Sequence, residues 1–257
     1  SHLLIYYGKI RKFKKHFAGR SLCSIYHKAH KLGLVAHIKY RKYSVNENFF
    51  KKWSNGMAYV LGWMFSDGNV TPDKRTFRIK LSARDVEVLR KLKSIMKTNS
   101  PIKISVQQLP SKKGFAYYAG LCVHSRTMCE DLSALGCTPN KTKRSMFPRM
   151  PSCVTSHFVR GFFDGDGSIS FNHPNTIKIR LVSSNENFIK WLADILEQQL
   201  GIPAKYKSVR ENFWQTDYYG DNARRFCNWI YASCGSYYLK RKRVRYMNYL
   251  VKRGNHV

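Results

Sequence analysis

The chain has 257 residues, 43% of them hydrophobic, which is enough for packed cores in one large domain or two of medium size. Its 46 Lys and Arg residues against 15 Asp and Glu residues give a formal net charge of +31, and so large an excess favours a polyanionic partner such as nucleic acid. No apolar run approaches the ~20 residues that span a bilayer, and the basic residues are spread along the whole chain, so we expect no membrane partner.

The first segment, residues 1–52, is basic and is predicted to hold a short helix. In "GRSLCSIYHKAHKLGL", Ser21 or Ser24 can cap a helix whose apolar residues recur every three to four positions, and Gly33 ends the pattern. Such a helix with a basic outer face is typical of a helix-turn-helix recognition helix, and the alternative is a surface helix with no special role. The candidate DNA contacts on its outer face are Tyr26, His27, Lys28 and Lys31.

From residue 55 onward the sequence repeats itself. "VLGWMFSDGNV" at 60–70 and "VRGFFDGDGSI" at 159–169 are both helical in pattern, both reach Asp-Gly, and both precede a predicted pair of strands. A helix, a second pair of strands and a further helix follow in each half. We therefore predict an α+β fold with two pseudo-symmetric halves, 53–148 and 149–257, each with the order helix, two strands, helix, two strands, helix.

Small residues recur four positions apart in the two repeated helices. Gly62 and Ser66 lie on one face of the first, and Gly161 and Gly165 lie on one face of the second. Because small side chains let two helix backbones approach closely, we expect these four residues to form the contact between the helices. Such a contact would bring the two Asp-Gly ends together.

Two aspartates at those ends predict a metal site. Asp67 and Asp166, held side by side, would repel each other unless a cation lay between them. Hard oxygen ligands favour Mg²⁺, and Mn²⁺ or Ca²⁺ could occupy the same site. The predicted site consists of these two metal ligands with their neighbours Ser66 and Gly165.

A metal beside basic strands suits phosphodiester hydrolysis, and two carboxylates serving two DNA strands imply one cut in each. Lys141 and Lys242 occupy corresponding places near the ends of the two halves and are candidates for a general acid or charge stabiliser. The alternative for either is a phosphate contact or a solvated lysine. The candidate DNA contacts on predicted strands are Arg75, Arg78, Lys80, Lys178, Arg180, Lys205, Lys207 and Arg210.

The two motifs, "VLGWMFSDG" and "VRGFFDGDG", resemble the signature motifs of the LAGLIDADG homing endonucleases in their single-chain form. The resemblance implies an αββαββα fold in each half, two antiparallel sheets that form a saddle over DNA, and Mg²⁺-dependent double-strand cleavage at a long target. It places the metal-binding acids at Asp67 and Asp166 and the peripheral lysines at Lys141 and, more loosely, Lys242. The first acidic position of the motif falls on Asp164 in the second copy but on Phe65 in the first, which we expect to affect packing and not metal binding.

The leading hypothesis is therefore a monomeric, site-specific endonuclease of double-stranded DNA, of the kind that serves intron homing, with the N-terminal segment as an additional helix-turn-helix. The alternative is a maturase of the same fold that binds intron RNA and assists splicing. Retention of both Asp67 and Asp166 favours the nuclease. Seven cysteines without a C-x-x-C pair indicate a reducing, intracellular compartment, such as the cytoplasm or an organelle in the host of a microbial, phage or organellar genome.

Overall fold

The computed structural model describes residues 17, 19–33, 42–109, 114–139, 147–173 and 176–254. The chain divides into two units, residues 1–42 and 43–257, and the segment boundaries predicted at 52/53 and 148/149 remain predictions. In the first unit, helix α2 (Leu22–Lys31) begins after Ser21, whose hydroxyl accepts a hydrogen bond of 3.1 Å from the Ser24 N–H. Gly33, with φ at 65°, follows the helix, so the structure contains the predicted helix.

The outer face of α2 carries His27, Lys28 and Lys31 as exposed residues, whereas the side chain of Tyr26 lies outside the described residues. Three basic residues, Lys28, His30 and Lys31, occupy the last turn, where they complement the negative end of the helix dipole. A helix-turn-helix in this segment remains a prediction.

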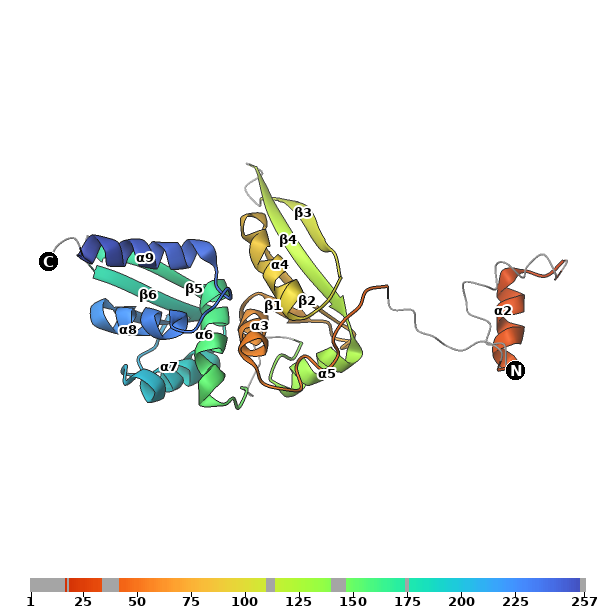
Figure 1. Cartoon of the computed structure of the whole chain (residues 1–257), viewed down its shortest axis with the longest axis horizontal. Coiled ribbons are helices and arrows are strands. Elements are labelled where there is room, and N and C mark those ends of the chain that lie inside the picture. The colour runs from red at the N-terminus through yellow and green to blue at the C-terminus, as the bar shows by residue number, and fades with distance from the viewer. Residues whose placement is uncertain are drawn as a thin grey trace. The chain divides into compact units, whose positions relative to one another are not determined.

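The second unit contains two halves with the same order of elements (Figure 1). The first half comprises α3 (Asn55–Ser66), β1 (Gly68–Val70), β2 (Thr76–Ser82), the 3-10 turn η2 (Ala83–Asp85), α4 (Val86–Ile95), β3 (Ile102–Gln108), β4 (Phe115–His124) and α5 (Arg126–Ala134). The second half comprises α6 (Ser152–Asp166), β5 (Gly167–His173), β6 (Thr176–Ser183), α7 (Glu186–Leu200), β7 (Lys207–Arg210), β8 (Phe213–Tyr219), α8 (Gly220–Tyr231) and α9 (Lys240–Gly254).

Each half has one four-stranded antiparallel sheet, in the order β1-β2-β4-β3 or β5-β6-β8-β7. The predicted α+β fold with two pseudo-symmetric halves is therefore confirmed. Helix α9 extends the second half and packs on β5.

Strand β2 shows why each sheet has one covered face and one open face. Its apolar residues Phe77, Ile79 and Leu81 are buried, whereas Arg78 and Lys80 between them are exposed, as the period of two in a strand requires. Strand β6 alternates in the same way. Helices α4 and α5 cover the apolar face of the first sheet, and α7, α8 and α9 cover that of the second.

Helices α3 and α6 pack against each other where the two halves meet (Figure 1). Residues 56–66 of α3 are all buried, which explains why this motif is apolar around its whole circumference. The Ser54 hydroxyl caps α3 by accepting a hydrogen bond of 3.1 Å from the Met57 N–H. Two segments far apart in the sequence thus form one central pair of helices.

All seven cysteines are free thiols. Within the ranges that the structure describes, no helix is both long enough and apolar enough to cross a membrane. The predicted compartment remains a prediction.

Candidate active site and nucleic-acid interface

The central helices touch backbone to backbone at two glycines. A Cβ atom on Gly62 would lie 2.8 Å from the Gly161 Cα and 2.6 Å from the Phe162 nitrogen, and it would also overlap the Phe158 carbonyl oxygen. A Cβ on Gly161 would overlap the Tyr59 carbonyl oxygen. Real Cβ atoms do not approach backbone atoms this closely, so the observed helix contact requires glycine at both positions.

The same contact brings the ends of the two motif helices together. Asp67 follows α3, with its N–H donating a hydrogen bond of 3.0 Å to the Trp63 carbonyl oxygen, and Asp166 is the last residue of α6. A Cβ on Gly165 would lie 2.7 Å from the Asp67 Oδ2 atom. The carboxylate that ends one motif helix therefore lies against the end of the other, in a contact that only glycine at position 165 permits.

The positive charge of Lys242 on α9 lies close enough to both carboxylates to interact with them. Burial lowers the pKa of Lys242 to about 8, and the negative charges of Asp164, Asp166 and Asp67 act in the opposite direction. One ammonium group thus interacts electrostatically with both predicted metal ligands. The structure brings Asp67 and Asp166 into one electrostatic neighbourhood at the ends of α3 and α6.

These residues fit a divalent cation in charge and in donor type. Two carboxylates supply hard oxygen donors, and the negative ends of two helix dipoles add to the same field. The absence of a side chain at Gly165 lets Ser66 and the Asp67 Oδ2 atom pack against the end of α6. Within the described ranges, no group of three or more His, Cys, Asp or Glu residues could hold a metal ion. The side-chain donors that a cation here would have are the carboxylates of Asp67 and Asp166.

The position of Lys242 contradicts its predicted role as a group that acts at the phosphate. Its side chain is 3% exposed, and its ammonium donates hydrogen bonds to three backbone carbonyl oxygens of Phe163, Asp164 and Gly167, at 2.5, 2.8 and 2.6 Å. An ammonium has three N–H donors, so all of them are committed. Lys242 caps the C-terminal end of α6. Lys141, the corresponding candidate in the first half, lies outside the described residues.

A buried polar cluster in α6 was not predicted from the sequence. Asp164 is 1% exposed, and its Oδ2 atom accepts hydrogen bonds of 2.8 Å from the Tyr59 hydroxyl and 2.8 Å from the Leu239 N–H. Burial raises the pKa of Asp164 to about 6. Since Tyr59 belongs to α3 and Leu239 precedes α9, this carboxylate connects the two motif helices and the end of the chain.

Arg160 completes the cluster one turn earlier. It is 0% exposed and donates hydrogen bonds to the carbonyl oxygens of Tyr237 and Ile230, at 2.5 and 2.6 Å, and to the His157 Nδ1 atom at 2.6 Å. The available sequence signal was the charge itself, because an arginine inside an apolar motif helix must find buried partners. The positions of those partners could not be derived from the sequence.

The corresponding residue to Asp164 in the first motif is Phe65, which lies in an aromatic cluster. Its ring lies 5.3 Å from that of Phe158 in an edge-on arrangement and 5.3 Å from that of Phe188 in a stacked one. Both positions therefore make contacts in the core, one apolar and one polar.

The predicted DNA contacts lie mainly on the open sheet faces. Arg78 and Lys80 on β2 are exposed, and the Lys80 ammonium lies 4.2 Å from the centre of the Tyr118 ring. Lys207 and Arg210 on β7 are also exposed. Two strand assignments were wrong, because Arg75 precedes β2 and Lys205 precedes β7.

Lys178 and Arg180 on β6 have an acidic partner that was not predicted. The Asp217 carboxylate on β8 accepts hydrogen bonds from Arg180 at 2.8 and 3.1 Å and lies 3.4 Å from the Lys178 ammonium. The open face of the second sheet therefore carries a cluster of paired charges, whereas the corresponding arginine of the first sheet, Arg78, faces Cys122.

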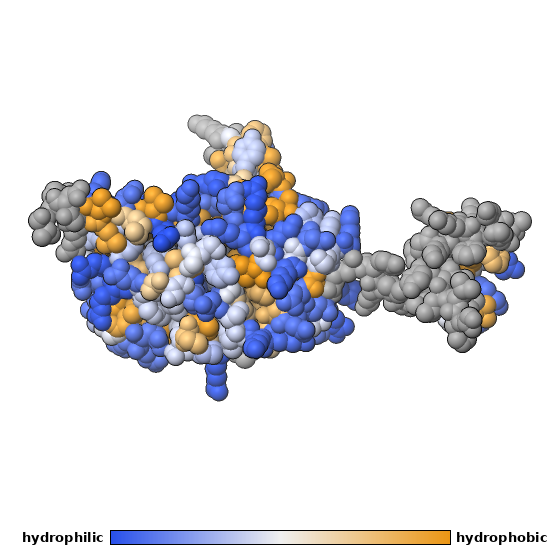
Figure 2. Space-filling model, viewed as in Figure 1, coloured by the Kyte–Doolittle hydropathy of each residue, from blue (hydrophilic) through white to orange (hydrophobic). Residues whose placement is uncertain are grey.

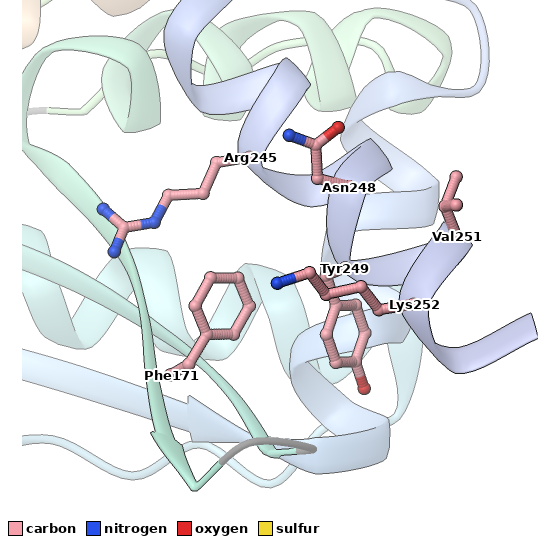
Figure 3. Close-up of a pocket in the computed structure, with 6 residues that line it drawn as sticks. All are labelled: Phe171, Arg245, Asn248, Tyr249, Val251 and Lys252. Atoms are coloured by element: carbon pink, nitrogen blue, oxygen red, sulfur yellow. The ribbon is translucent and has the colours of Figure 1, made fainter. Parts of the chain in front are cut away.

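Two further surface features accompany the sheets. The β3–β4 hairpin exposes Ile104, Val106 and Phe115 on its side that continues the covered face, and Figure 2 shows hydrophobic residues gathered there on an otherwise largely hydrophilic surface. A hollow of about 560 Å³ lies between β5 and α9 (Figure 3), where the Arg245 guanidinium lies 5.4 Å from the centre of the Phe171 ring. Both features lie on the helix-covered side of their sheets.

Comparisons with known proteins agree with this architecture. A model of the WhiA LAGLIDADG-like domain matches residues 56–119, and a model of a LAGLIDADG-like domain matches residues 154–231. Among curated proteins, DNA-directed RNA polymerase subunit Rpo1C of Methanocaldococcus jannaschii is 25% identical over 141 residues, which are 54% of this chain. The match spans 15% of that subunit.

Two solved structures share the fold. Full-length DUF199/WhiA from Thermatoga maritima has a TM-score of 0.50 and 18% identity, over 80% of this chain and 64% of that chain. The homing endonuclease I-WcaI bound to its DNA recognition sequence has a TM-score of 0.56 and 12% identity, over 84% of this chain and 97% of that chain. With a matched LAGLIDADG-like domain in each half and this shared architecture, the chain has a two-motif LAGLIDADG fold.

Proposed function

We propose that this protein is a site-specific DNA endonuclease that hydrolyses one phosphodiester bond in each strand of a long duplex target. The observation that carries the proposal is the approach of Asp67 to the end of α6, where Gly165 and Asp166 lie. The fold is shared with homing endonucleases, one of which was solved bound to its DNA recognition sequence. A formal net charge of +31 supports duplex DNA as the partner.

In the proposed mechanism, exposed basic residues such as Arg78, Lys80 and Lys207 hold the phosphates and base edges of the duplex. Asp67 and Asp166 would hold a divalent cation, Mg²⁺ being the natural one for carboxylate oxygens. Its chemistry there would be to polarise the phosphoryl oxygen and to lower the pKa of a water molecule. Lys242 fixes the end of α6 through its three carbonyl partners and so positions Asp166. Because one chain supplies both motif helices, the active species is a monomer.

The test begins with a target selected from a randomised duplex library in EDTA, so that binding is measured without cutting. That target is then incubated with the wild-type protein in Mg²⁺ and in EDTA. We expect Mg²⁺-dependent double-strand cleavage, and a loss of at least about a hundredfold in rate in Asp67→Asn and in Asp166→Asn, because each removes one of two charged ligands. Asp221→Asn, on the surface of α8, is the matched control and keeps full activity. Cleavage that survives in either motif variant contradicts the proposal.

A second candidate is sequence-specific DNA binding without cleavage. The geometry of Lys242 favours it, since the ammonium expected to assist at the phosphate is committed to backbone oxygens. A selected target that is bound tightly but never cut in Mg²⁺ or Mn²⁺ supports this candidate. Tighter binding of a structured RNA than of any duplex in the same assay supports the maturase hypothesis.

A further inference from the structure

Each sheet presents one arginine at the same place in its ladder. Arg78 on β2 pairs with Asn69, the second residue of the strand that follows the first motif helix. Arg180 on β6 pairs with Ser168, the second residue of the strand that follows the second motif helix. Both arginines point to the open face of their sheet, between buried apolar neighbours. The two halves therefore offer an internal comparison.

The strand on the other side of each arginine differs between the halves. Arg78 faces Cys122 on β4, whereas Arg180 faces Asp217 on β8. Across the eight strands that the structure describes, Asp217 is the single acidic residue. An acid at the middle of a surface otherwise suited to polyanions needs a specific reason, because its charge repels DNA phosphates.

The Asp217 carboxylate accepts two hydrogen bonds from one edge of the Arg180 guanidinium. Arg180 donates its Nε–H to Oδ1 at 2.8 Å and one N–H of its NH2 nitrogen to Oδ2 at 3.1 Å. Gln215 donates to the same Oδ2 at 2.9 Å, and Lys178 lies 3.4 Å from it. The Asp217 side chain is 9% exposed, so the carboxylate is largely shielded from water. Burial alone would raise the pKa of Asp217, but Arg180 and Lys178 outweigh it and hold the pKa below its usual value.

A second edge of the same guanidinium remains accessible. An arginine has five N–H donors in a planar fork, and the two bonds to Asp217 use the edge formed by Nε and one terminal nitrogen. The end formed by the two terminal nitrogens still presents a parallel pair of N–H groups, and the Arg180 side chain is 37% exposed. Two parallel donors of this kind match the O6 and N7 acceptors of guanine in the major groove.

We propose that Asp217 determines base specificity in the second half by fixing Arg180 in the orientation that recognises one guanine. The proposal rests on DNA binding as the proposed function but not on cleavage. A fixed fork loses little conformational entropy on binding, and it cannot turn to contact a phosphate instead. Asp217 therefore lowers non-specific affinity and raises discrimination at one base pair.

The test uses the full chain in EDTA, with a randomised duplex library and sequencing of the bound fraction. We expect the wild-type profile to contain a strongly preferred guanine whose preference falls about tenfold in Asp217→Asn, because the guanidinium is no longer gripped at both oxygens. Arg180→Lys should remove the same preference, since an ammonium cannot form the parallel pair. Affinity for a fixed, unrelated duplex should stay equal or rise in Asp217→Asn, which a loss of folding would not produce.

Glu87→Gln is the matched control, because it also removes one negative charge but lies exposed on α4. It should leave the base profile unchanged. Profiles of Asp217→Asn and Arg180→Lys that coincide with the wild-type profile overturn the proposal. If the wild-type protein shows no base preference at all, both this proposal and site-specific binding are wrong. If it shows a clear preference but does not cut in Mg²⁺, only the proposed endonuclease activity is contradicted.

Discussion

The two motif helices share their glycine contact but differ in how they are packed. At corresponding places relative to Gly62 and Gly161, α3 has Leu61 and Phe65 where α6 has Arg160 and Asp164. The first pair is buried among apolar side chains. The second pair is equally buried but hydrogen-bonded to Tyr59, to the last turn of α8 and to the segment between α8 and α9.

The repeated helix is therefore held in place by apolar packing in the first half and by buried hydrogen bonds in the second. Phe65 needs only neighbours of suitable volume, and Phe158 and Phe188 provide them. Arg160 and Asp164 need partners at fixed positions, because a buried charge without hydrogen bonds is costly. The polar version therefore locks the segment at 230–239 onto α6, and the apolar version does not require such a segment.

The largest expected effect comes from substituting the glycines at the contact between α3 and α6, which both halves share. Gly62→Ala places a methyl group into the backbone of α6, so the central helices must separate and the free energy of unfolding should fall by about 3 kcal/mol. Gly161→Ala should behave alike. Urea unfolding measures both, with Gly120→Ala as control, because the nearest atom to a Cβ there is 3.9 Å away. A Gly62→Ala protein as stable as the control would show that the helix contact is not as close as described.

The next effect concerns the second half alone. Lys242→Met keeps most of the side-chain volume but leaves three buried carbonyl oxygens without their donor, which should lower the free energy of unfolding by about 3 kcal/mol. Lys240→Met, exposed on the same helix, should change it by less than about 0.5 kcal/mol. If urea unfolding shows the same change in the free energy of unfolding for both substitutions, Lys242 does not stabilise the protein by capping α6.

The smallest of the three effects is a pH dependence specific to the second half. Burial and the adjacent Arg160 charge lower the pKa of His157 to about 4, compared with about 6.5 in an unfolded chain. Between these values the unfolded chain binds a proton that the folded chain does not, so stability is lost as pH falls through this window. His157 is 2% exposed, and we expect a loss of roughly 2 kcal/mol between pH 7 and pH 4.5.

His157→Gln should remove that part of the pH dependence while keeping an acceptor for Arg160. The measurement is urea unfolding of both proteins at the two pH values, since other titrating groups cancel in the difference. At the corresponding place in the first motif stands Ala58, which does not titrate. If both proteins lose the same free energy between pH 7 and pH 4.5, His157 is not buried beside Arg160 as described.

Patterns local in the sequence predicted much of the fold. The repeated motifs, the order of helices and strands in each half, and the N-terminal helix followed from periodicity, caps and glycines, because these act over a few residues. The small residues at Gly62 and Gly161 predicted which helix faces meet. Strand ends depend on pairing with distant strands, and Arg75 and Lys205, predicted on strands, precede β2 and β7.

By itself, the sequence determined the repeated architecture, the pairing of the motif helices and the excess of positive charge. Only the tertiary structure decided that Lys242 caps α6, that Arg160 and Asp164 bind the segment before α9, and that Asp217 grips Arg180. The physical reason is the sequence separation between the interacting groups. Each of these interactions joins groups at least 37 residues apart, and their partners depend on strand register and on where α9 returns to the core.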